Sequence, residues 1–487
     1  MLLVGRVLTF DPRFPEATAL VTAGDRIIDV GSAADLRARY PAERRFVVEM
    51  ITPGLHDSHV HPLQWGMALS RLDLRGRNDP REVAHRVREE AANLPRGEWI
   101  RGGGFVFGDY PDSTLLDEAA PHNPVFLESR DLHSAWVNRT ALALAGINDL
   151  TPDPPGGKML RDDSGCPTGY LLERAVRLVQ RVLPPPKRQD LSRGLEDLAR
   201  RGFVAVHAMG EVPEATIWIR ELALAESLPV RVAWVLQHSE VKNWEPEKLG
   251  DYLHIFGAKF FADGALTSRT AWMRRPYPGG GFGMPVDDPR EVDSKVIEVL
   301  QRGFAPVWHA IGTRAIQELL NMITRVAAAG LSLRSVVRIE HVQHVGDEDI
   351  QRLAGMALSV QPQHAADDLV ALEALGDGSV REAYRWGEMA RLRGVRVLLG
   401  SDAPVAVPDP GETLKYASAH PLPGAEGMPR HIAIRGYVHD PAAYLGWDKE
   451  RYAWGKISAG SRAALTLWED GTPIARLWRG YVEPVTT

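Results

Sequence analysis

The chain has 487 residues, of which 44% are hydrophobic and 25% are charged, as in ordinary soluble globular proteins; this length allows one large enzyme domain and a smaller one. Its formal net charge of -6 gives no basic character that would indicate a nucleic-acid partner. Its single cysteine, Cys166, excludes an internal disulfide framework and a cysteine-rich zinc site.

The N-terminal stretch MLLVGRVLTF is interrupted by Arg6 and has no small-residue cleavage site, so it does not have the pattern of a secretory signal. No run of the chain approaches the roughly 20 apolar residues that a membrane-spanning helix needs. We therefore expect a cytoplasmic protein without a membrane partner.

The two ends of the chain have the same β-rich character. Residues 1–50 contain the β-branched runs LLVGRVLTF, ATALVTAGDRIIDVG and RFVVEM, separated by turn residues. Residues 455–487 contain KISAG, AALTLWEDG and IARLWRGYVE, which have the same texture. We predict that 1–50 and 455–487 together form a small composite β-sandwich domain.

The middle of the chain, residues 51–454, alternates apolar strands with amphipathic helices such as SRGLEDLARRG, TRAIQELLNMITRVAAAG and EAYRWGEMARLRG. This alternation favours a (β/α)8 TIM-like barrel over an open doubly wound sheet, because the glycines of RGGGFVFG lack the strand and helix context of a dinucleotide-binding motif. The eight predicted strands are ITPGLHDSHVH, FVAVHAM, VRVAWVL, AKFFADG, FAPVWHA, VVRIEHV, MALSVQPQH and VRVLLGSD.

About 140 residues separate the first and second predicted strands, far more than a crossover needs. This stretch contains its own elements, including PVFLESRD and AWVNRTALALAGI. We predict a large insertion after the first barrel strand, a subdomain of about 70–200. Barrel loops at strand C-terminal ends build active sites, so this insertion is expected to shape the substrate pocket.

The first barrel strand ends in HDSHVH. Side chains at positions i and i+2 of a strand point to the same side, so His59 and His61 can converge on one metal ion. The alternative is that both are polar residues exposed at a strand end. His56 lies an odd number of positions from both, so strand alternation directs its side chain to the other face, and we assign it no ligand role.

Further candidate ligands come at or near the ends of later apolar runs, where a barrel places its catalytic groups. These are Lys259, His309, His341 and Asp402. Singly, each has a structural alternative, such as a core imidazole, a helix cap or a pair with Glu340. Taken together they supply nitrogen and oxygen ligands to one end of the barrel.

With these motifs in order, the sequence resembles the amidohydrolase superfamily, in particular the YtcJ-like group (amidohydrolase family 3), which includes N-substituted formamide deformylase. The resemblance covers nearly the whole chain. It rests on PGLHDSHVHP, KFFADGALTSRTA, HAIGTRA, RIEHVQ and GSDAP, with weaker similarity in HSAWVN, GCPTGYLLE and GKISAGSRAAL. One departure is Ala464, where the family usually has aspartate; it lies in the β-rich end and leaves the chemistry untouched.

The resemblance implies a metal-ligand set in this chain of His59, His61, Lys259, His309, His341 and Asp402. It also implies that Asp402 takes a proton from the attacking water, and that Lys259 is carboxylated to bridge two metals. Carboxylation needs a neutral amine, which burial favours. Phe260 and Phe261 fit that, although a lysine paired with Asp263 is the alternative.

The resemblance therefore implies a metal-dependent hydrolase acting on carbon–nitrogen bonds other than peptide bonds. Asp402 is the expected general base, with His341 near the polarised carbonyl. One or two divalent ions are expected, with zinc favoured and iron or manganese also compatible with mixed nitrogen and oxygen ligands. Another barrel metallohydrolase, of deaminase or esterase/lactonase type, and a non-catalytic regulatory descendant remain alternatives.

His133, Arg269 and Trp272 are candidate substrate-binding residues, and Trp136 and Trp308 are further candidates for the pocket. Core packing explains the last two equally well. The expected partner is a small-molecule substrate, and a homodimer is the default expectation for assembly.

Overall fold

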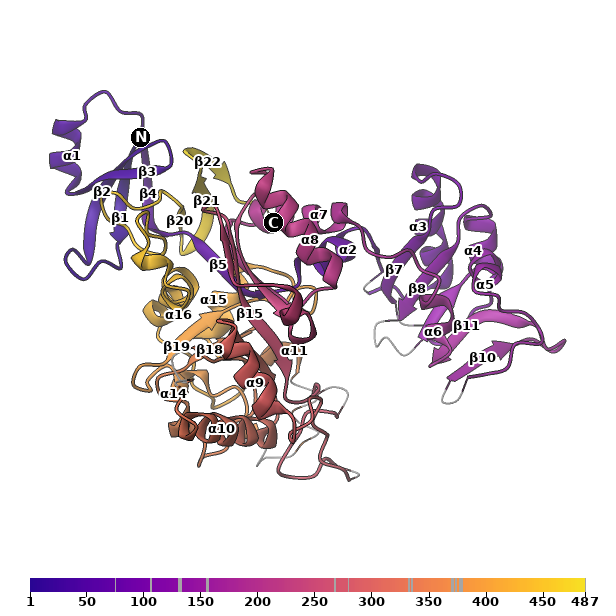
Figure 1. The fold of residues 1–487 in the computed structure, drawn as a ribbon. Helices are drawn as coiled ribbons and strands as arrows, with labels where there is room; N and C mark the ends of the chain where they lie inside the picture. Colours follow the sequence, from indigo (N-terminus) through magenta and orange to yellow (C-terminus); the bar gives the residue numbers. More distant parts are fainter. Residues whose placement is uncertain are drawn as a thin grey trace. The chain divides into compact units, whose positions relative to one another are not determined.

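The computed structural model describes residues 1–74, 76–105, 107–129, 134–154, 157–266, 269–278, 280–331, 333, 336–368, 372, 375 and 380–486. The chain divides into two compact units (Figure 1). The first unit combines Met1–Gly66 with Arg188–Thr487, and the second is Met67–Lys187.

Eight parallel strands form the centre of the first unit. In chain order they are β5 (Leu55–Val60), β12 (Phe203–Met209), β13 (Arg231–Gln237), β15 (Leu253–Phe261), β16 (Ala305–Ala310), β17 (Arg338–His341), β18 (Ala357–Val360) and β19 (Arg396–Leu399), each paired with the next. A parallel bridge between Val60 and Ala403 brings the two ends of this path together. The predicted barrel is confirmed as a nearly closed, eight-stranded parallel sheet.

The barrel strands are buried on both faces, which explains their almost continuous apolar runs. All seven residues of β12 are buried, for example. The helices α8 (Pro213–Leu224), α9 (Val292–Gln301) and α10 (Thr313–Ala328) follow β12, β15 and β16 and lie outside the strands (Figure 1). In α10, Ile316, Leu319 and Ile323 repeat at helical spacing and are buried, as expected of a helix that covers a sheet.

One predicted helix is much shorter than expected. In the segment EAYRWGEMARLRG (382–394) the structure has only the four-residue α14 (Trp386–Met389). Ala383 pairs with His344 in an isolated bridge, and Tyr384 has a left-handed backbone with φ 50°. A left-handed residue cannot continue a right-handed helix, so helical spacing alone was misleading here.

Both ends of the chain contribute to a seven-stranded sheet of order β22-β21-β20-β4-β1-β2-β3. Its strands are β1 (Leu2–Leu8), β2 (Glu16–Ala23), β3 (Arg26–Gly31), β4 (Arg45–Pro53), β20 (Leu465–Glu469), β21 (Thr472–Trp478) and β22 (Tyr481–Pro484). The C-terminal β20 pairs antiparallel with β4, which leads directly into β5. The described strands form one sheet, and the arrangement as a sandwich domain stays a prediction.

The second unit has a six-stranded sheet of order β10-β11-β9-β8-β7-β6. The strands are β6 (Leu72–Asp73), β7 (Ile100–Phe105), β8 (Val125–Ser129), β9 (Ser134–Val137), β10 (Gly157–Arg161) and β11 (Pro167–Glu173), and the helices include α3 (Pro80–Asn93), α4 (Thr114–Ala119), α5 (Arg139–Leu144) and α6 (Val176–Gln180). Leu127, Phe105 and Trp136 belong to its buried core. The unit overlaps most of the segment predicted as an insertion.

Two glycines set the contact between α2 (Pro62–Leu69) and α7 (Arg188–Arg200), where the chain leaves and re-enters the barrel unit. A Cβ added at Gly66 would lie 1.7 Å from the Asp190 carbonyl oxygen, and one at Gly194 would lie 1.9 Å from the Pro62 carbonyl oxygen. Residues 66 and 190 are therefore neighbours in space although the whole second unit separates them in sequence.

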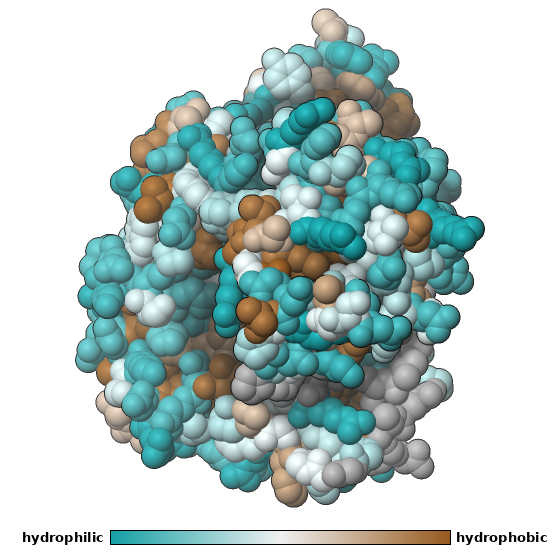
Figure 2. Space-filling model, turned by 90° about the vertical axis from the view of Figure 1, so that its right-hand side faces the viewer, coloured by the Kyte–Doolittle hydropathy of each residue, from teal (hydrophilic) through white to brown (hydrophobic). Residues whose placement is uncertain are grey.

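None of the helices in the described part of the chain is long and apolar enough to cross a membrane. The face in Figure 2 is largely hydrophilic, and its hydrophobic residues occur in separate small groups. The expected lack of a membrane partner stays a prediction.

Candidate metal centre

The six predicted ligands come from five strands of the barrel and lie at or near their C-terminal ends. His59 is in β5 and His61 follows it; Lys259 is in β15, His309 in β16, His341 ends β17, and Asp402 lies three residues beyond β19.

Asp402 lies between the two histidines of the first strand. Its Oδ1 is 3.3 Å from His59 Nε2 and 3.4 Å from His61 Nε2. Two ligands bound at about 2.1 Å to one tetrahedral ion lie about 3.4 Å apart, so this spacing fits a shared cation. His59, His341 and Asp402 offer three ligand atoms within 4.8 Å of one another, and all three residues are buried. The donor set therefore fits a divalent metal of the zinc type.

His309 lies next to His341, with ring centroids 4.5 Å apart. Its Nε2 is 3.1 Å from the Gly264 carbonyl oxygen. A carbonyl only accepts, so Nε2 carries the proton and Nδ1 is left as the ligand atom. His309 thus also has a nitrogen suited to a metal.

Lys259 is 1% exposed. Burial lowers the pKa of its amine to about 8, although the negative charges of Glu340 and Asp402 act to raise it. A larger neutral fraction is the condition that carboxylation of this amine requires.

Asp263, the alternative partner of Lys259, instead accepts hydrogen bonds from three backbone N–H groups. The donors are Trp272 at 2.7 Å, Ile311 at 2.9 Å and Gly312 at 2.8 Å. Burial raises the pKa of Asp263 to about 7, while these hydrogen bonds act to lower it. Through these hydrogen bonds Asp263 joins the loop after β15 to the residues that follow His309. Its Oδ1 also lies 3.9 Å from His309 Nε2.

A buried charged network orients His59. His59 Nδ1 donates to Glu340 Oε2 at 2.6 Å, and Arg338 Nε lies 2.6 Å from Glu340 Oε1. Arg338 also donates to His207 Nδ1 at 2.6 Å and to the Ser58 carbonyl. Burial raises the pKa of Glu340, but Arg338 and His59 outweigh it and bring the pKa to about 2. An ionised Glu340 keeps the proton on His59 Nδ1 and leaves Nε2 free for a metal.

Two of the candidate ligands have left-handed backbones: φ is 71° at His341 and 59° at Asp402. Strict strand alternation would direct Glu340 and His341 to opposite sides, yet both contact His59, whose ring centroid is 4.8 Å from that of His341. The left-handed turn at His341 accounts for this. Such strain costs about 1–3 kcal/mol per residue and is concentrated at functional sites.

Three polar residues at this end of the barrel were not singled out from the sequence. His341 Nδ1 donates to Gln361 Oε1 at 2.9 Å, and His364 Nε2 lies 3.8 Å from Asp402 Oδ2. Gln343 Nε2 lies 3.5 Å from His364 Nδ1. The signal was available, because Gln361 directly follows the seventh strand, β18, and His364 comes four positions after its last residue, much as other candidates follow their strands.

The predicted substrate-binding residues are only partly placed. His133 lies outside the described residues. Arg269 is exposed, and its guanidinium donates to the Pro278 carbonyl at 3.4 Å. Trp272 is half-buried, is joined through its backbone to Asp263, and has the Arg314 guanidinium 5.7 Å from its ring. Roles in substrate binding stay predictions for all three.

The two other tryptophans pack in cores. Trp308 stacks on Phe260 with ring centroids 4.7 Å apart. Trp136 is fully buried in the second unit, where its indole N–H donates to the Asp112 carbonyl at 2.8 Å. Both positions match the core-packing alternative.

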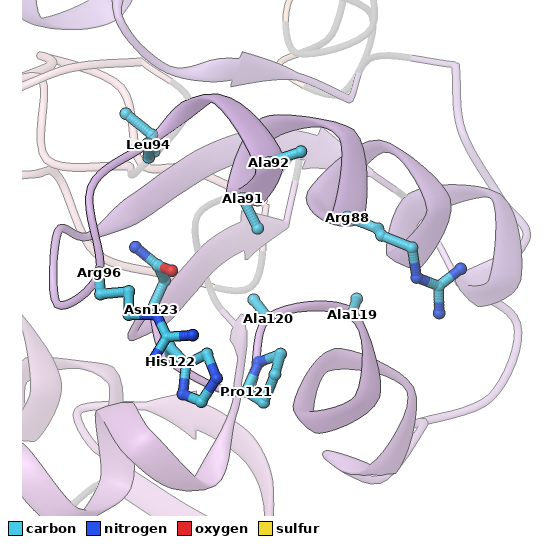
Figure 3. A pocket seen from close by; sticks show the side chains of 10 residues that line it. All are labelled: Arg88, Ala91, Ala92, Leu94, Arg96, Ala119, Ala120, Pro121, His122 and Asn123. Carbon is cyan, nitrogen blue, oxygen red and sulfur yellow. The ribbon is translucent and has the colours of Figure 1, made fainter.

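A hollow of about 370 Å³ lies on the second unit between α3 and the end of α4 (Figure 3). It is lined by Arg88, Ala91, Ala92, Leu94, Arg96, Ala119, Ala120, Pro121, His122 and Asn123. The side-chain amide of Asn123 is already bonded to the Pro95 and Glu98 carbonyls. None of the candidate ligands lines this hollow, so it is not part of the metal centre.

The chain is similar to known proteins over most of its length. A family model described as "Amidohydrolase family" matches residues 49–477, and one described as "Imidazolonepropionase-like composite domain, bacteria" matches residues 19–42. YtcJ of Bacillus subtilis (strain 168) is 30% identical over 495 residues, covering 94% of this chain and 92% of YtcJ.

Two further proteins are similar over almost their whole length. N-substituted formamide deformylase of Arthrobacter pascens is 28% identical over 518 residues, covering 96% of this chain and 92% of the deformylase. The crystal structure of an uncharacterized metal-dependent hydrolase from Pyrococcus furiosus matches with a TM-score of 0.80 and 26% identity, covering 96% of this chain and 99% of that one.

Proposed function

The chain belongs to the amidohydrolase family, and we propose that it hydrolyses a carbon–nitrogen bond other than a peptide bond in a small amide or formamide-like molecule. The observation that carries the proposal is the group His59, His341 and Asp402, whose ligand atoms lie within 4.8 Å of one another at the C-terminal end of the barrel. The similarity to N-substituted formamide deformylase supports the formamide class.

We propose two divalent ions, most simply zinc. His59, His61 and Asp402 would hold one, and His309 and His341 the other, with a carboxylated Lys259 between them. The bound metal would supply a water of lowered pKa and polarise the substrate carbonyl. The buried Lys259, with a pKa lowered to about 8, supports carboxylation.

Asp402 is the proposed general base. Burial raises the pKa of this carboxyl, but His59, His61 and His341 lower it well below its usual range, so it is ionised. An ionised carboxylate at this position can accept the proton of the attacking water and pass it to the leaving amine. Glu340 and Arg338 do not move protons in this scheme; they hold His59 in place.

The first test is a substrate panel. N-substituted formamides, other amides, esters and nucleobase amines are incubated with the metal-loaded protein, and product formation is measured for each. Release of amine from N-phenylformamide supports the proposal. Turnover of esters or nucleobases alone favours the esterase or deaminase alternative, and no turnover by fully loaded protein favours a non-catalytic descendant.

Asp402→Asn should lower kcat by about 100-fold or more, because the amide cannot accept the proton. Metal content, measured by elemental analysis, should stay at the wild-type level. Asp163→Asn, at an exposed position, is the matched control and should keep wild-type kcat. Wild-type turnover in Asp402→Asn would remove Asp402 from the role of base.

Elemental analysis of the wild-type protein also tests the metal count. Two ions per chain are expected, together with a carbamate signal in the carbon-13 NMR spectrum of the folded protein supplied with carbon-13 bicarbonate. One ion and an unmodified amine would contradict the binuclear form.

A further inference from the structure

The segments that follow β17 and β18 carry buried polar atoms that make no hydrogen bond to the residues that the structure describes. They are Gln343 Oε1, Gln361 Nε2 and His364 Nε2. The three residues are 4%, 2% and 6% exposed. A buried polar atom without a hydrogen bond lowers the stability of the fold by about 1–3 kcal/mol. Three such atoms beside Asp402 are therefore expected to form hydrogen bonds with a bound ligand.

The hydrogen bonds that these residues do make fix which of them donate. His341 Nδ1 donates to Gln361 Oε1 at 2.9 Å. The NH₂ group of Gln361 therefore points away from His341 and is left as a donor without a hydrogen bond. Gln343 Nε2 lies 3.5 Å from His364 Nδ1, which makes Nδ1 the acceptor and places the ring proton on Nε2.

The cluster therefore presents two donors, Gln361 Nε2 and His364 Nε2, and one acceptor, Gln343 Oε1. His364 Nε2 is 3.8 Å from Asp402 Oδ2, too far for a hydrogen bond but close enough for both to touch one small ligand. The rings of His364 and His341 are nearly parallel, 15° apart, with centroids 6.2 Å apart. The unpaired atoms thus lie directly beside the candidate metal ligands.

We propose that Gln343, Gln361 and His364 form the subsite that recognises the amide group of the substrate, a step that rests on the proposed function. The carbonyl oxygen of an N-monosubstituted amide accepts from Gln361 and His364, and its N–H donates to Gln343 Oε1. The subsite therefore selects amides with one N–H over tertiary amides and esters, which would leave Gln343 Oε1 unpaired.

The test compares N-phenylformamide with N-methyl-N-phenylformamide, which differs by replacement of the N–H by a methyl group. In the metal-loaded wild type, kcat/KM should be about 10- to 100-fold higher for N-phenylformamide. Gln343→Met, which keeps the side-chain length and removes the acceptor, should lose this preference. His364→Phe should instead lower kcat/KM for both compounds, because both have the carbonyl oxygen.

Gln237→Met is the matched control, since Gln237 also ends a barrel strand but its amide already donates to the Gly210 carbonyl at 2.6 Å. It should keep the wild-type preference, and metal content should be unchanged in all three variants. Equal losses for both formamides in Gln343→Met would overturn the proposal, as would loss of bound metal in His364→Phe, which would make His364 a ligand.

Failure of the proposed function is distinguishable from failure of the subsite. If the loaded wild type hydrolyses neither formamide, the dissociation constants of both are measured on it by calorimetry. Tighter binding of N-phenylformamide that disappears in Gln343→Met supports the subsite without the reaction; no difference between the two compounds rejects it.

Discussion

Glu340 is the residue on which the orientation of His59 depends. We predict that Glu340→Gln weakens metal binding by about 10- to 100-fold, because the neutral amide no longer holds the proton on His59 Nδ1. It also leaves Arg338 buried without its counter-charge, so the melting temperature should fall. The dissociation constant for Zn²⁺ is measured by competition with a chelator.

Glu388→Gln serves as the control for Glu340, because Glu388 is an exposed partner of Arg385. It should bind zinc as the wild type does. An unchanged zinc affinity in Glu340→Gln would show that His59 is oriented without this carboxylate.

We predict that the half-buried His254, in the barrel strand β15, makes the stability of the protein depend on pH. Burial lowers the pKa of His254 to about 3, and its Nδ1 accepts the indole N–H of Trp447 at 3.1 Å. The unfolded chain binds a proton near the ordinary value of 6.5, whereas the folded protein does not, so stability falls as pH drops below 6.5.

Because the unfolded chain takes up this proton, the free energy of unfolding should fall by about 2 kcal/mol between pH 6.5 and pH 5. Urea denaturation of the wild type and His254→Gln at both pH values measures it. The variant keeps an acceptor for Trp447 but cannot titrate, so its loss should be smaller by that amount. Identical losses would contradict the assignment.

Single residues also show the limits of prediction from sequence. His59, His61, Lys259, His309, His341 and Asp402 could be named because each falls at or near the end of an apolar run, and their chain order matched a known family. The partnership of His59 with Glu340 could not be predicted, because the two lie 281 residues apart and nothing local links them. The same holds for His364 and Asp402.

At the scale of elements, the contact of α2 with α7 depends on glycine. We predict that Gly194→Ala lowers the unfolding free energy by about 1–3 kcal/mol, because its methyl group would overlap the Pro62 carbonyl oxygen. Gly108→Ala is the control, since an added Cβ there meets nothing within 4 Å. Urea denaturation measures both, and equal stabilities would show that α7 shifts without cost.

The elements that sequence predicted best are the barrel strands. Six of the eight predicted runs contain the whole observed strand, because a strand buried on both faces must be apolar throughout. The other two overlap it in part: β13 extends one residue beyond VRVAWVL, to Gln237, and β15 begins five residues before AKFFADG, at Leu253. The segment 382–394 shows the converse: its helical spacing was real, but the bridge from Ala383 to His344 competed with it. Long-range pairing of this kind leaves no trace in a local pattern.

At the scale of the whole molecule, all the candidate ligands belong to the barrel unit. Gly66 and Asp190 are in near contact, so Met67–Lys187 could be replaced by a linker of about five glycine and serine residues without stretching the chain. We predict that this shortened protein folds cooperatively and binds the same number of zinc ions as the full chain. Circular dichroism melting and elemental analysis check this, and loss of bound zinc would show that the second unit is needed to form the centre.

During synthesis of the chain, strand β4 of the seven-stranded sheet is made long before its partner β20. A ribosome produces β4 more than 400 residues before β20, its partner, as the hydrogen bond from Glu49 N–H to Glu469, 420 positions away, shows. Until the last strands emerge, one edge of β4 stays open to pairing with other nascent chains. Premature termination shortly before Leu465 would therefore leave the whole barrel translated and yet produce an aggregating polypeptide.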